Sequence, residues 1–322
     1  MSQKHPVIAI TGSVGAGTTT VQRIFANIFQ RNKINASYVH GNSFRKYPRD
    51  ELASIFSCAE KNGKPISHFG PEVNLLDRLE SLFREYSRSG SGCVREYIET
   101  HEQAAKHQLP IGNFSPWTEL PETSDLLFYE GQHGGCTQAN WSKRKLSESH
   151  NPFVIQQRAK SKNTIDTGID IAQWVDLLIG IAPSINLEWM QKIHRSCSIT
   201  GCTAEQATRL ILRRMEDYVH YMTPQFSITD INFQRIPIVD TSCPFGLDDI
   251  PQEEECMLVI RFREPQKHDI VNYVKQFPNA FLSRPNTLVV PNSCMAQAID
   301  TICSPLVQKL VYPESHDAPT NQ

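Results

Sequence analysis

The first thirty residues change from one hydrophobic pattern to another. Residues 7–10 are a short apolar run rich in β-branched side chains, which is typical of a buried strand. A glycine-rich stretch follows at 12–20. Beyond it, apolar side chains recur at helical spacing, at Val21, Ile24, Phe25, Ile28 and Phe29. The pattern therefore predicts a strand, a tight loop and an amphipathic helix, in that order.

The rest of the chain alternates between the same two patterns. Further strands are predicted at 36–40, 95–98, 125–130, 175–182, within 225–242, and at 257–263 and 287–290. Helices are predicted between 50 and 90, with breaks at Gly-Lys-Pro (63–65) and Gly-Pro (70–71), and at 186–195, 204–221 and 295–310. The stretch at 104–122 is expected to be loop. This alternation predicts an α/β fold with a mixed, mainly parallel sheet flanked by helices.

The second half carries no motif of its own, so one domain is predicted over 1–311. The polar stretch at 138–168 is expected to be a variable surface excursion, and 312–322 a loose tail.

The glycine-rich stretch has the spacing of a phosphate-binding P-loop. Its glycines let backbone N–H groups turn toward phosphate oxygens, and the following helix adds a positive dipole. Thr18 stands where the usual motif has lysine, whereas Thr19 occupies the position that holds Mg²⁺. The alternative is an ordinary glycine-rich turn, but the flanking strand and helix favour the P-loop. The predicted nucleotide-binding residues are Gly12, Ser13, Gly15, Ala16, Gly17, Thr18, Thr19 and Thr20.

Two more strands bring candidate chemistry to the same edge, because ligands of parallel sheets bind at the carboxyl ends of strands. The strand at 125–130 ends in Glu130, a candidate Mg²⁺ ligand and catalytic residue. After the strand at 36–40, a kinase needs a carboxylate to accept the proton of the attacking hydroxyl. The sequence supplies Asn42 instead. Arg45 and Arg49 follow, and suit a phosphorylated substrate, although such clusters are more often solvated loops.

The helix at 204–221 carries Arg213 and Arg214. Paired arginines on a helix can act as a lid over a nucleotide and stabilise the transferring phosphoryl group. They can equally be a solvent-facing basic stretch, and the sequence alone does not separate these readings.

Composition narrows the class of partner. The 322 residues are 39% hydrophobic and 20% charged, with a net charge of -2, so no basic excess points to nucleic acid. None of the nine cysteines forms a Cys-x-x-Cys pair, which argues against a zinc site. No apolar run approaches the ~18 residues of a membrane span, and no membrane partner is expected. These features predict a cytoplasmic protein.

Several stretches together resemble the bacterial, class I type of phosphoribulokinase. They are the glycine-rich loop at 12–18, Phe-Tyr-Glu-Gly-x-His-Gly at 128–134, Ile-Asn-Leu-Glu-Trp at 185–189, Gln-Lys-Ile-His-Arg at 191–195, Pro-Gln-Phe-Ser at 224–227, Asn-Phe-Gln-Arg at 232–235 and Val-Asp-Thr-Ser at 239–242. The resemblance implies a P-loop nucleoside-kinase-like fold. It also implies transfer of the γ-phosphoryl group of ATP to the 1-hydroxyl of ribulose 5-phosphate, with Mg²⁺, in a homo-oligomer that responds to NADH and AMP. Threonine in place of the P-loop lysine is normal in this family.

The resemblance also assigns roles by position. Retained residues are Arg49 for substrate, Glu130, Lys192 and Arg195 for catalysis, and Arg213 and Arg214 beside the nucleotide. Arg261 fits one of two arginines tied to effector binding, whereas Asp248 replaces the other.

The substrate half of the implied site departs from the family pattern. Asn42 stands at the position of the proposed base, and Ser196 replaces a metal-associated aspartate. Arg45 replaces a substrate-contacting histidine, and Thr200 replaces a substrate-binding arginine. Glu99 replaces a further histidine, for which His101 is the neighbouring candidate. General-base catalysis contributes ~10²–10⁴ in rate, so activity is expected to be weakened or lost.

Three hypotheses remain at this point. The first is an active phosphoribulokinase with a substitute base, for which Asp50 and Glu51 are the candidates. The second is a kinase for a different phosphorylated substrate. The third is a relative that binds nucleotide without catalysis.

Overall fold

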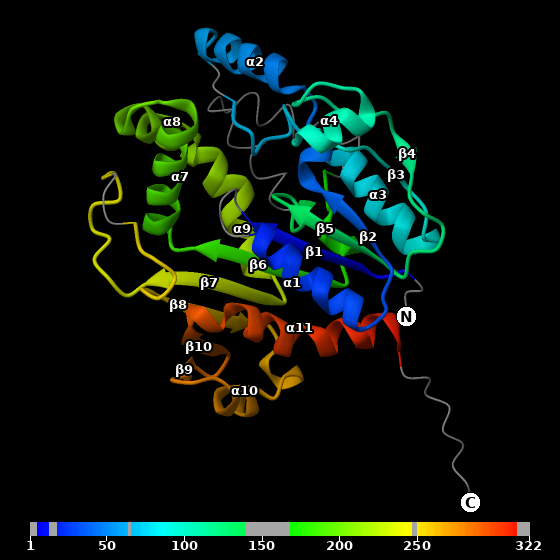
Figure 1. The fold of residues 1–322 in the computed structure, drawn as a ribbon, viewed down its shortest axis with the longest axis vertical. Helices are drawn as coiled ribbons and strands as arrows, with labels where there is room; N and C mark the ends of the chain where they lie inside the picture. The colour runs from blue at the N-terminus through cyan, green and yellow to red at the C-terminus, as the bar shows by residue number, and fades with distance from the viewer. Residues whose placement is uncertain (1–4, 13–17, 64–65, 139–167, 247–249, 314–322) are drawn as a thin grey trace, which may run out of the picture.

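A mixed sheet of eight strands forms the centre of the protein (Figure 1). The computed structural model describes residues 5–12, 18–63, 66–138, 168–246 and 250–313. The strands of this sheet are β1 (Val7–Gly12), β2 (Ala36–His40), β5 (Leu126–Gly131), β6 (Leu177–Pro183), β7 (Ile231–Pro237), β8 (Cys256–Phe262), β9 (Phe281–Arg284) and β10 (Thr287–Pro291).

The strand order is β2-β5-β1-β6-β7-β8-β10-β9. The first five strands run parallel, and the last three pair antiparallel. The predicted α/β fold with a mainly parallel sheet is therefore confirmed.

Nine α-helices surround the sheet in the described residues. They are α1 (Thr18–Arg31), α2 (Arg49–Lys61), α3 (Leu76–Ser89), α4 (His101–His107), α7 (Ile185–Thr200), α8 (Ala204–Asp217), α9 (Thr223–Ile228), α10 (Ile270–Gln276) and α11 (Met295–Val311). A small hairpin of β3 (Cys93–Val94) and β4 (Thr118–Glu119) stands apart from the main sheet. None of the described helices is long and apolar enough to cross a bilayer.

The alternation of side chains along β1 divides the core between the two faces of the sheet. Ile8 and Ile10 belong to one buried cluster with apolar residues of α1 and α11, and Val7 and Ala9 belong to another with residues of α3. Successive side chains of a strand point to opposite faces, so an all-apolar strand is buried on both. The central strands are thus covered by helices on both sides, and only their ends are open to a ligand.

Several predicted elements differ in detail. The strand expected at 95–98 is instead β3, and only Tyr97 of that range makes an isolated bridge, to Phe114. The loop expected at 104–122 includes most of α4 and all of β4, because the capping box of Thr100 and Gln103 starts a helix there. The helix at 186–195 extends to Thr200. No element is predicted from the sequence for α10 or β9, which are short and lie at the far edge of the sheet.

The helix predicted at 204–221 does not run evenly to its end. It is α-helical to Asp217, then forms a π-helical turn at Tyr218–Met222, and continues directly into α9. Such turns widen a helix locally and are frequent at functional sites.

Candidate active site

The carboxyl ends of β2, β5 and β1 lie side by side. His40 of β2 is in register with Glu130 of β5, which is in register with Ile10 of β1. Neighbouring strands are 4.7–4.9 Å apart, so the ends of all three lie within about 10 Å. The residues that follow these strands therefore begin at one edge of the sheet, and the shared crevice predicted there stays a prediction.

The predicted P-loop connects β1 to α1. The strand ends at Gly12 and the helix begins at Thr18, as the sequence pattern predicts. Ser13, Gly15, Ala16 and Gly17 lie outside the described residues, as do the side chains of Thr18 and Thr19, and Thr20 is exposed on α1. The flanking elements are confirmed, and the nucleotide contacts remain a prediction.

Glu130 is a buried carboxyl group at the end of β5. Its side chain is only 4% exposed, and it makes no hydrogen bond or ion pair with the described part of the chain. A buried acidic group is costly unless a cation or a hydrogen-bond donor balances it. The position therefore fits a carboxylate that holds a bound metal ion.

Gln225, in α9, fastens the loop after β5 to the end of β1. It is fully buried. Its Oε1 accepts hydrogen bonds from Thr11 Oγ1 and the Gly135 N–H, both at 2.8 Å, and its Nε2 donates to the carbonyls of Gln132 and Tyr221, both at 2.7 Å. One amide thus joins β1, the β5 loop and the π-helical turn. The sequence indicates Gln225 only as part of the motif at 224–227 and predicts no role for it.

His133, in the same loop, is also buried. Its Nε2 donates to the carbonyl of Phe69 at 2.8 Å, and its own N–H donates to Tyr129 Oη at 3.4 Å. Burial, together with the positive charge of Arg45, lowers the pKa of His133 to about 4. The ring is therefore neutral at physiological pH.

The pKa of His133 is lower in the folded protein than in the unfolded chain, so we expect the free energy of unfolding to fall in acid. The contribution of neutral His133 to stability is complete above pH 6.5. It is lost as the pH falls toward 4, because the unfolded chain takes up the proton first. The loss amounts to about 3 kcal/mol. Urea unfolding at pH 7.5 and pH 4.5 measures it against His133→Gln, which keeps a donor to Phe69 but does not titrate. Equal pH dependence in both proteins would contradict the assignment.

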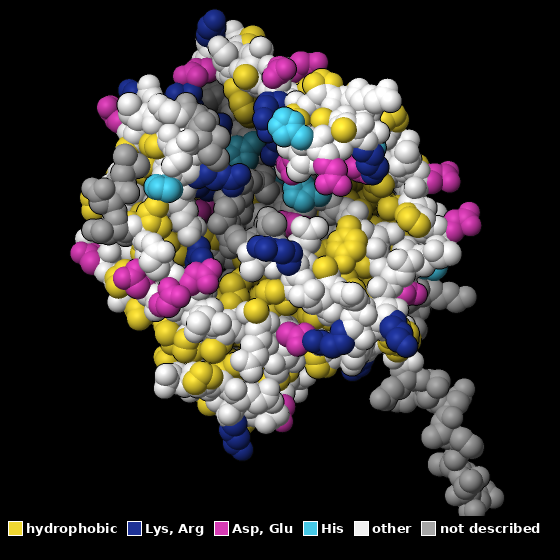
Figure 2. Space-filling model, viewed as in Figure 1, with side chains coloured by type: hydrophobic (Ala, Val, Ile, Leu, Met, Phe, Trp, Pro, Cys, Tyr) yellow, Lys and Arg dark blue, Asp and Glu magenta, His cyan; other side chains and the backbone are white. Residues whose placement is uncertain are grey.

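A cavity of about 560 Å³ lies between α2, α7 and α8. Four cationic side chains line it and give it the name used below, the cation cavity: Arg45, Lys192, Arg195 and Arg214. Figure 2 shows Lys, Arg and His side chains gathered around the hollow on this face. Cations that converge from separate elements on one cavity favour a phosphorylated ligand.

The cations of this cavity are held by specific neighbours. Lys192 forms an ion pair with the buried Glu188, which also accepts a hydrogen bond from Tyr218 Oη at 2.8 Å. The Lys192 ammonium lies 5.2 Å from the centre of the Tyr218 ring. Burial, with Arg213 alongside, lowers the pKa of Arg214 to about 10, so Arg214 is still charged at neutral pH.

His68 lies on the wall of the same cavity. Burial and the charges of Arg214, Lys192 and Arg45 hold its pKa well below the ordinary range. The histidine therefore adds no charge to the cavity at neutral pH, and its ring can act as a neutral hydrogen-bonding group.

The two arginines of α8 have different surroundings. Arg214 faces the cation cavity and stacks 5.5 Å from the ring centre of Phe56 in α2. Arg213 forms an ion pair with Glu60 of α2 at 2.6 Å, on the outside. Arg214 thus contacts α2 across the cavity and Arg213 contacts it on the outside, and their predicted place over the nucleotide stays a prediction.

The remaining predicted residues are partly brought together. Ser196 and Arg195 line the cation cavity with Lys192, whereas Arg49 is exposed at the start of α2, and its N–H donates to the Gly112 carbonyl at 2.9 Å. His101 is exposed at the start of α4 and is not among the residues that line the cation cavity. Asp248 and the side chain of Thr200 lie outside the described residues.

Arg261, the predicted effector residue, is engaged within the fold. Its guanidinium donates to the Phe226 carbonyl at 2.5 Å and to Thr229 Oγ1 at 3.0 Å. These contacts fasten the end of α9 to β8.

Asn42 follows β2, where a base is expected, and has an acidic neighbour. Its side-chain Nδ2 donates to Glu99 Oε1 at 2.6 Å, and its backbone N–H donates to His40 Nδ1 at 3.2 Å. The carboxylate that contacts Asn42 is that of Glu99, whereas Asp50 and Glu51, the candidates expected from the sequence, are exposed in the first turn of α2.

Known proteins similar to this chain agree on one family. The sequence profile described as the Phosphoribulokinase / Uridine kinase family matches residues 7–145 and 163–242. The chain is 42% identical to a phosphoribulokinase of Nitrobacter vulgaris over 312 residues, which are 97% of this chain and 98% of that protein. It is 44% identical to a phosphoribulokinase of Sinorhizobium medicae (strain WSM419) over 311 residues, again 97% and 98%. The solved phosphoribulokinase from Rhodobacter spheroides superposes with a TM-score of 0.80 at 38% identity, over 96% of this chain and 98% of that one.

Proposed function

The chain belongs to the phosphoribulokinase and uridine kinase family, and on that premise we propose that it transfers the γ-phosphoryl group of ATP to ribulose 5-phosphate. The observation that carries the proposal is the cation cavity, where Arg45, Lys192, Arg195 and Arg214 meet beside the carboxyl edge of the sheet. A sugar phosphate supplies the anionic group that such a cavity binds.

In this proposal ATP lies on the loop between β1 and α1, with Thr19 and Glu130 as the residues that hold Mg²⁺. The burial of Glu130 at the end of β5, with no side-chain hydrogen bond or ion pair to the described residues, supports that role. When bound, Mg²⁺ neutralises charge on the phosphate oxygens during transfer. The chain's own contribution is to place the sugar phosphate in the cation cavity and its hydroxyl in line with the γ-phosphorus.

Homo-oligomeric assembly and control by NADH or AMP are also part of the proposal. They rest on the resemblance to the family alone. Arg261, the residue proposed for effector control, is engaged by carbonyl and hydroxyl groups of its own chain, so an effector would have to compete with those contacts.

A kinase for another phosphorylated substrate is the second candidate. The wall of the cation cavity includes Phe56, Trp189, Leu210, Ile211 and Met215, which present apolar surface to whatever the cations hold. This surface favours a substrate with a larger apolar part than a five-carbon sugar phosphate has.

The test is ADP release with Mg·ATP and ribulose 5-phosphate, with the product identified by phosphorus NMR. We expect saturable turnover and ribulose 1,5-bisphosphate as the product, and the turnover number tests the weakening expected from Asn42 and Ser196. In Lys192→Met we expect KM for the sugar phosphate to rise about 10- to 100-fold, the worth of a hydrogen bond to a charged group, with KM for ATP unchanged.

Lys275→Met is the matched control, because Lys275 is exposed on α10, away from the cation cavity. Turnover only with a different sugar phosphate would favour the second candidate. ATP binding without any turnover would contradict both and favour a nucleotide-binding protein without catalysis.

A further inference from the structure

A glutamate from the small hairpin region stands beside Asn42 at the carboxyl end of β2. We propose that this residue, Glu99, is the general base of the reaction. The inference rests on the proposed function, and it assigns the carboxylate that the sequence at position 42 lacks. Asn42 then becomes a positioning residue that holds the base.

The first support is the location of the pair. Asn42 lies in the 3₁₀ turn Gly41–Phe44, directly after β2, and β2 is two strands from β1, where the predicted P-loop begins. Two strand spacings are about 10 Å, so a side chain beside the end of β2 and a nucleotide phosphate bound after β1 can approach the same sugar hydroxyl, as general-base attack requires. Arg45, which lines the cation cavity, is three residues beyond Asn42.

The second support is the way the two segments are joined. Arg95 donates from Nε to the Ser43 carbonyl at 2.8 Å and from Nη2 to the Arg45 carbonyl. The guanidinium of Arg45 lies 5.2 Å from the ring centre of Tyr97. With the bond between Asn42 and Glu99, these contacts hold segment 42–45 against segment 95–99 along its whole length.

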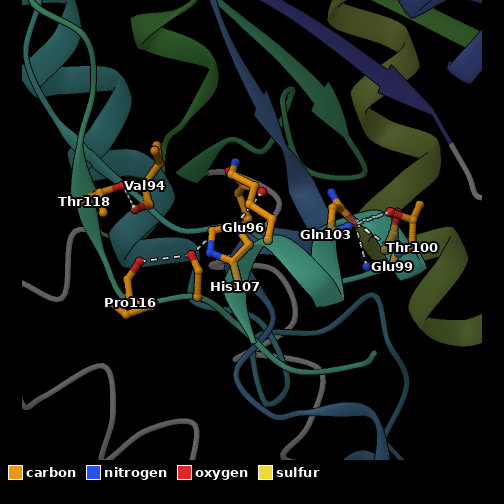
Figure 3. Close-up of polar contacts among 10 residues, drawn as sticks. Val94, Glu96, Glu99, Thr100, Gln103, His107, Pro116 and Thr118 are labelled. Carbon is orange, nitrogen blue, oxygen red and sulfur yellow. Dashed lines mark hydrogen bonds and ion pairs between the residues drawn. The ribbon is translucent and has the colours of Figure 1, made fainter. Parts of the chain in front are cut away.

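The backbone of Glu99 is fixed from the other side as well. Its N–H donates to Gln103 Oε1 at 2.8 Å, within the capping box that begins α4 (Figure 3). The preceding residue, Ile98, exchanges hydrogen bonds with the turn at 112–113, donating to Asn113 at 2.9 Å and accepting from Gly112 at 2.8 Å. A base that is fixed in this way meets the requirement for preorganisation.

Glu99 differs from the nearby Glu96 in its electrostatic partners. Glu96 accepts hydrogen bonds from Lys106 at 2.7 Å and His107 at 3.0 Å, as Figure 3 shows for His107, and the bond from Lys106 lowers its pKa. Glu99 is exposed, and among the described residues its Oε1 accepts only from Asn42. Both carboxylate oxygens of Glu96 are therefore engaged by side chains of α4, whereas within the described residues one oxygen of Glu99 is left to accept a proton. Among the described residues, the other acidic, basic and histidine side chains that line the cavity beside Glu99 are His40, Arg95, Glu96, His107 and Glu119, and Arg45 is three residues beyond Asn42.

Glu99 accepts the proton of the attacking sugar hydroxyl while that oxygen bonds to the γ-phosphorus and the bond between the γ-phosphorus and the β–γ bridging oxygen breaks. ADP leaves with the electron pair of that bond. Because Glu99 is exposed, the proton then passes to water.

Three variants test the proposal: Glu99→Gln, the swapped pair Asn42→Asp/Glu99→Gln, and Glu102→Gln as the matched control, an exposed glutamate in the first turn of α4. We expect Glu99→Gln to lower kcat about 10²- to 10⁴-fold with little change in KM for ATP, and to abolish the acidic limb of the kcat–pH profile. The kcat of the swapped pair should be at least about tenfold higher than that of Glu99→Gln, and the kcat of Glu102→Gln should equal that of the wild type. Melting curves check that each variant folds.

Two results would overturn the assignment of Glu99 while leaving the proposed function intact. The first is an active wild type together with a Glu99→Gln variant whose kcat is within threefold of the wild-type value. The second is a Glu99→Gln variant with a low kcat whose kcat–pH profile keeps its acidic limb. No recovery in the swapped pair also counts against it. A wild type without any turnover on sugar phosphates would overturn the base together with the kinase function, so the two failures are distinguishable.

Discussion

Replacing Glu130 with glutamine is expected to lower kcat about 10³-fold, the effect of removing one preorganised electrostatic group from a phosphoryl-transfer site. The amide has nearly the shape of the carboxyl group but cannot balance the charge of a metal ion. Half-maximal activity should also need a much higher Mg²⁺ concentration. Initial rates over a Mg²⁺ titration measure both effects.

The same substitution should make the protein more stable in the absence of ligands. Glu130 is 4% exposed without a hydrogen bond or ion pair in the described residues, so a neutral amide there removes a desolvation cost. We therefore expect Tm to rise while activity falls. Glu122→Gln, at an exposed position just before β5, should change neither. Full activity in Glu130→Gln would show that the carboxylate has no part in the reaction.

Replacing Gln225 with leucine is expected to destabilise the protein by about 3–5 kcal/mol. The change leaves the Thr11 hydroxyl, the Gly135 N–H and the carbonyls of Gln132 and Tyr221 without their present partner. An unsatisfied buried polar group costs about 1–3 kcal/mol, and local rearrangement recovers part of the total. At this chain length, Tm should fall by about 10 °C.

Gln173→Leu is the matched control, because Gln173 is exposed and makes one local hydrogen bond, to the Asp170 carbonyl. Scanning calorimetry of the two variants separates the loss of the buried network from the general effect of a glutamine-to-leucine change. Equal melting temperatures would mean that the residues around Gln225 find other partners.

The sequence predicts the scaffold of the site better than its contacts. The strand and helix around the glycine-rich loop, and the strand that ends in Glu130, are predicted because local hydrophobic period determines them. The same reasoning places Asn42 correctly at the end of β2. It cannot place Glu99 beside it, because the two residues are 57 positions apart and meet only through the packing of the hairpin region.

The substitute bases proposed from the sequence show this limit. Asp50 and Glu51 are near Asn42 along the chain, but they begin an exposed helix, α2. Gln225 is missed for a related reason, since a buried amide is recognised by the four groups it satisfies and not by its neighbours in sequence. The π-helical turn is missed because the pattern before and after it is equally helical.

That π-helical turn at Tyr218–Met222 sets the rotational phase between α8 and α9. An α-helix advances about 100° per residue, so a turn with one residue more than the regular ladder offsets the two helices by about that angle. The offset lets one nearly continuous rod present Arg214 to the cation cavity and Gln225 to the ends of β1 and β5. Shortening the turn by a residue would restore a regular helix and turn one of these side chains away from its partners. The π-helical turn thus couples the position of Arg214 at the cation cavity to the position of Gln225 at the strand ends.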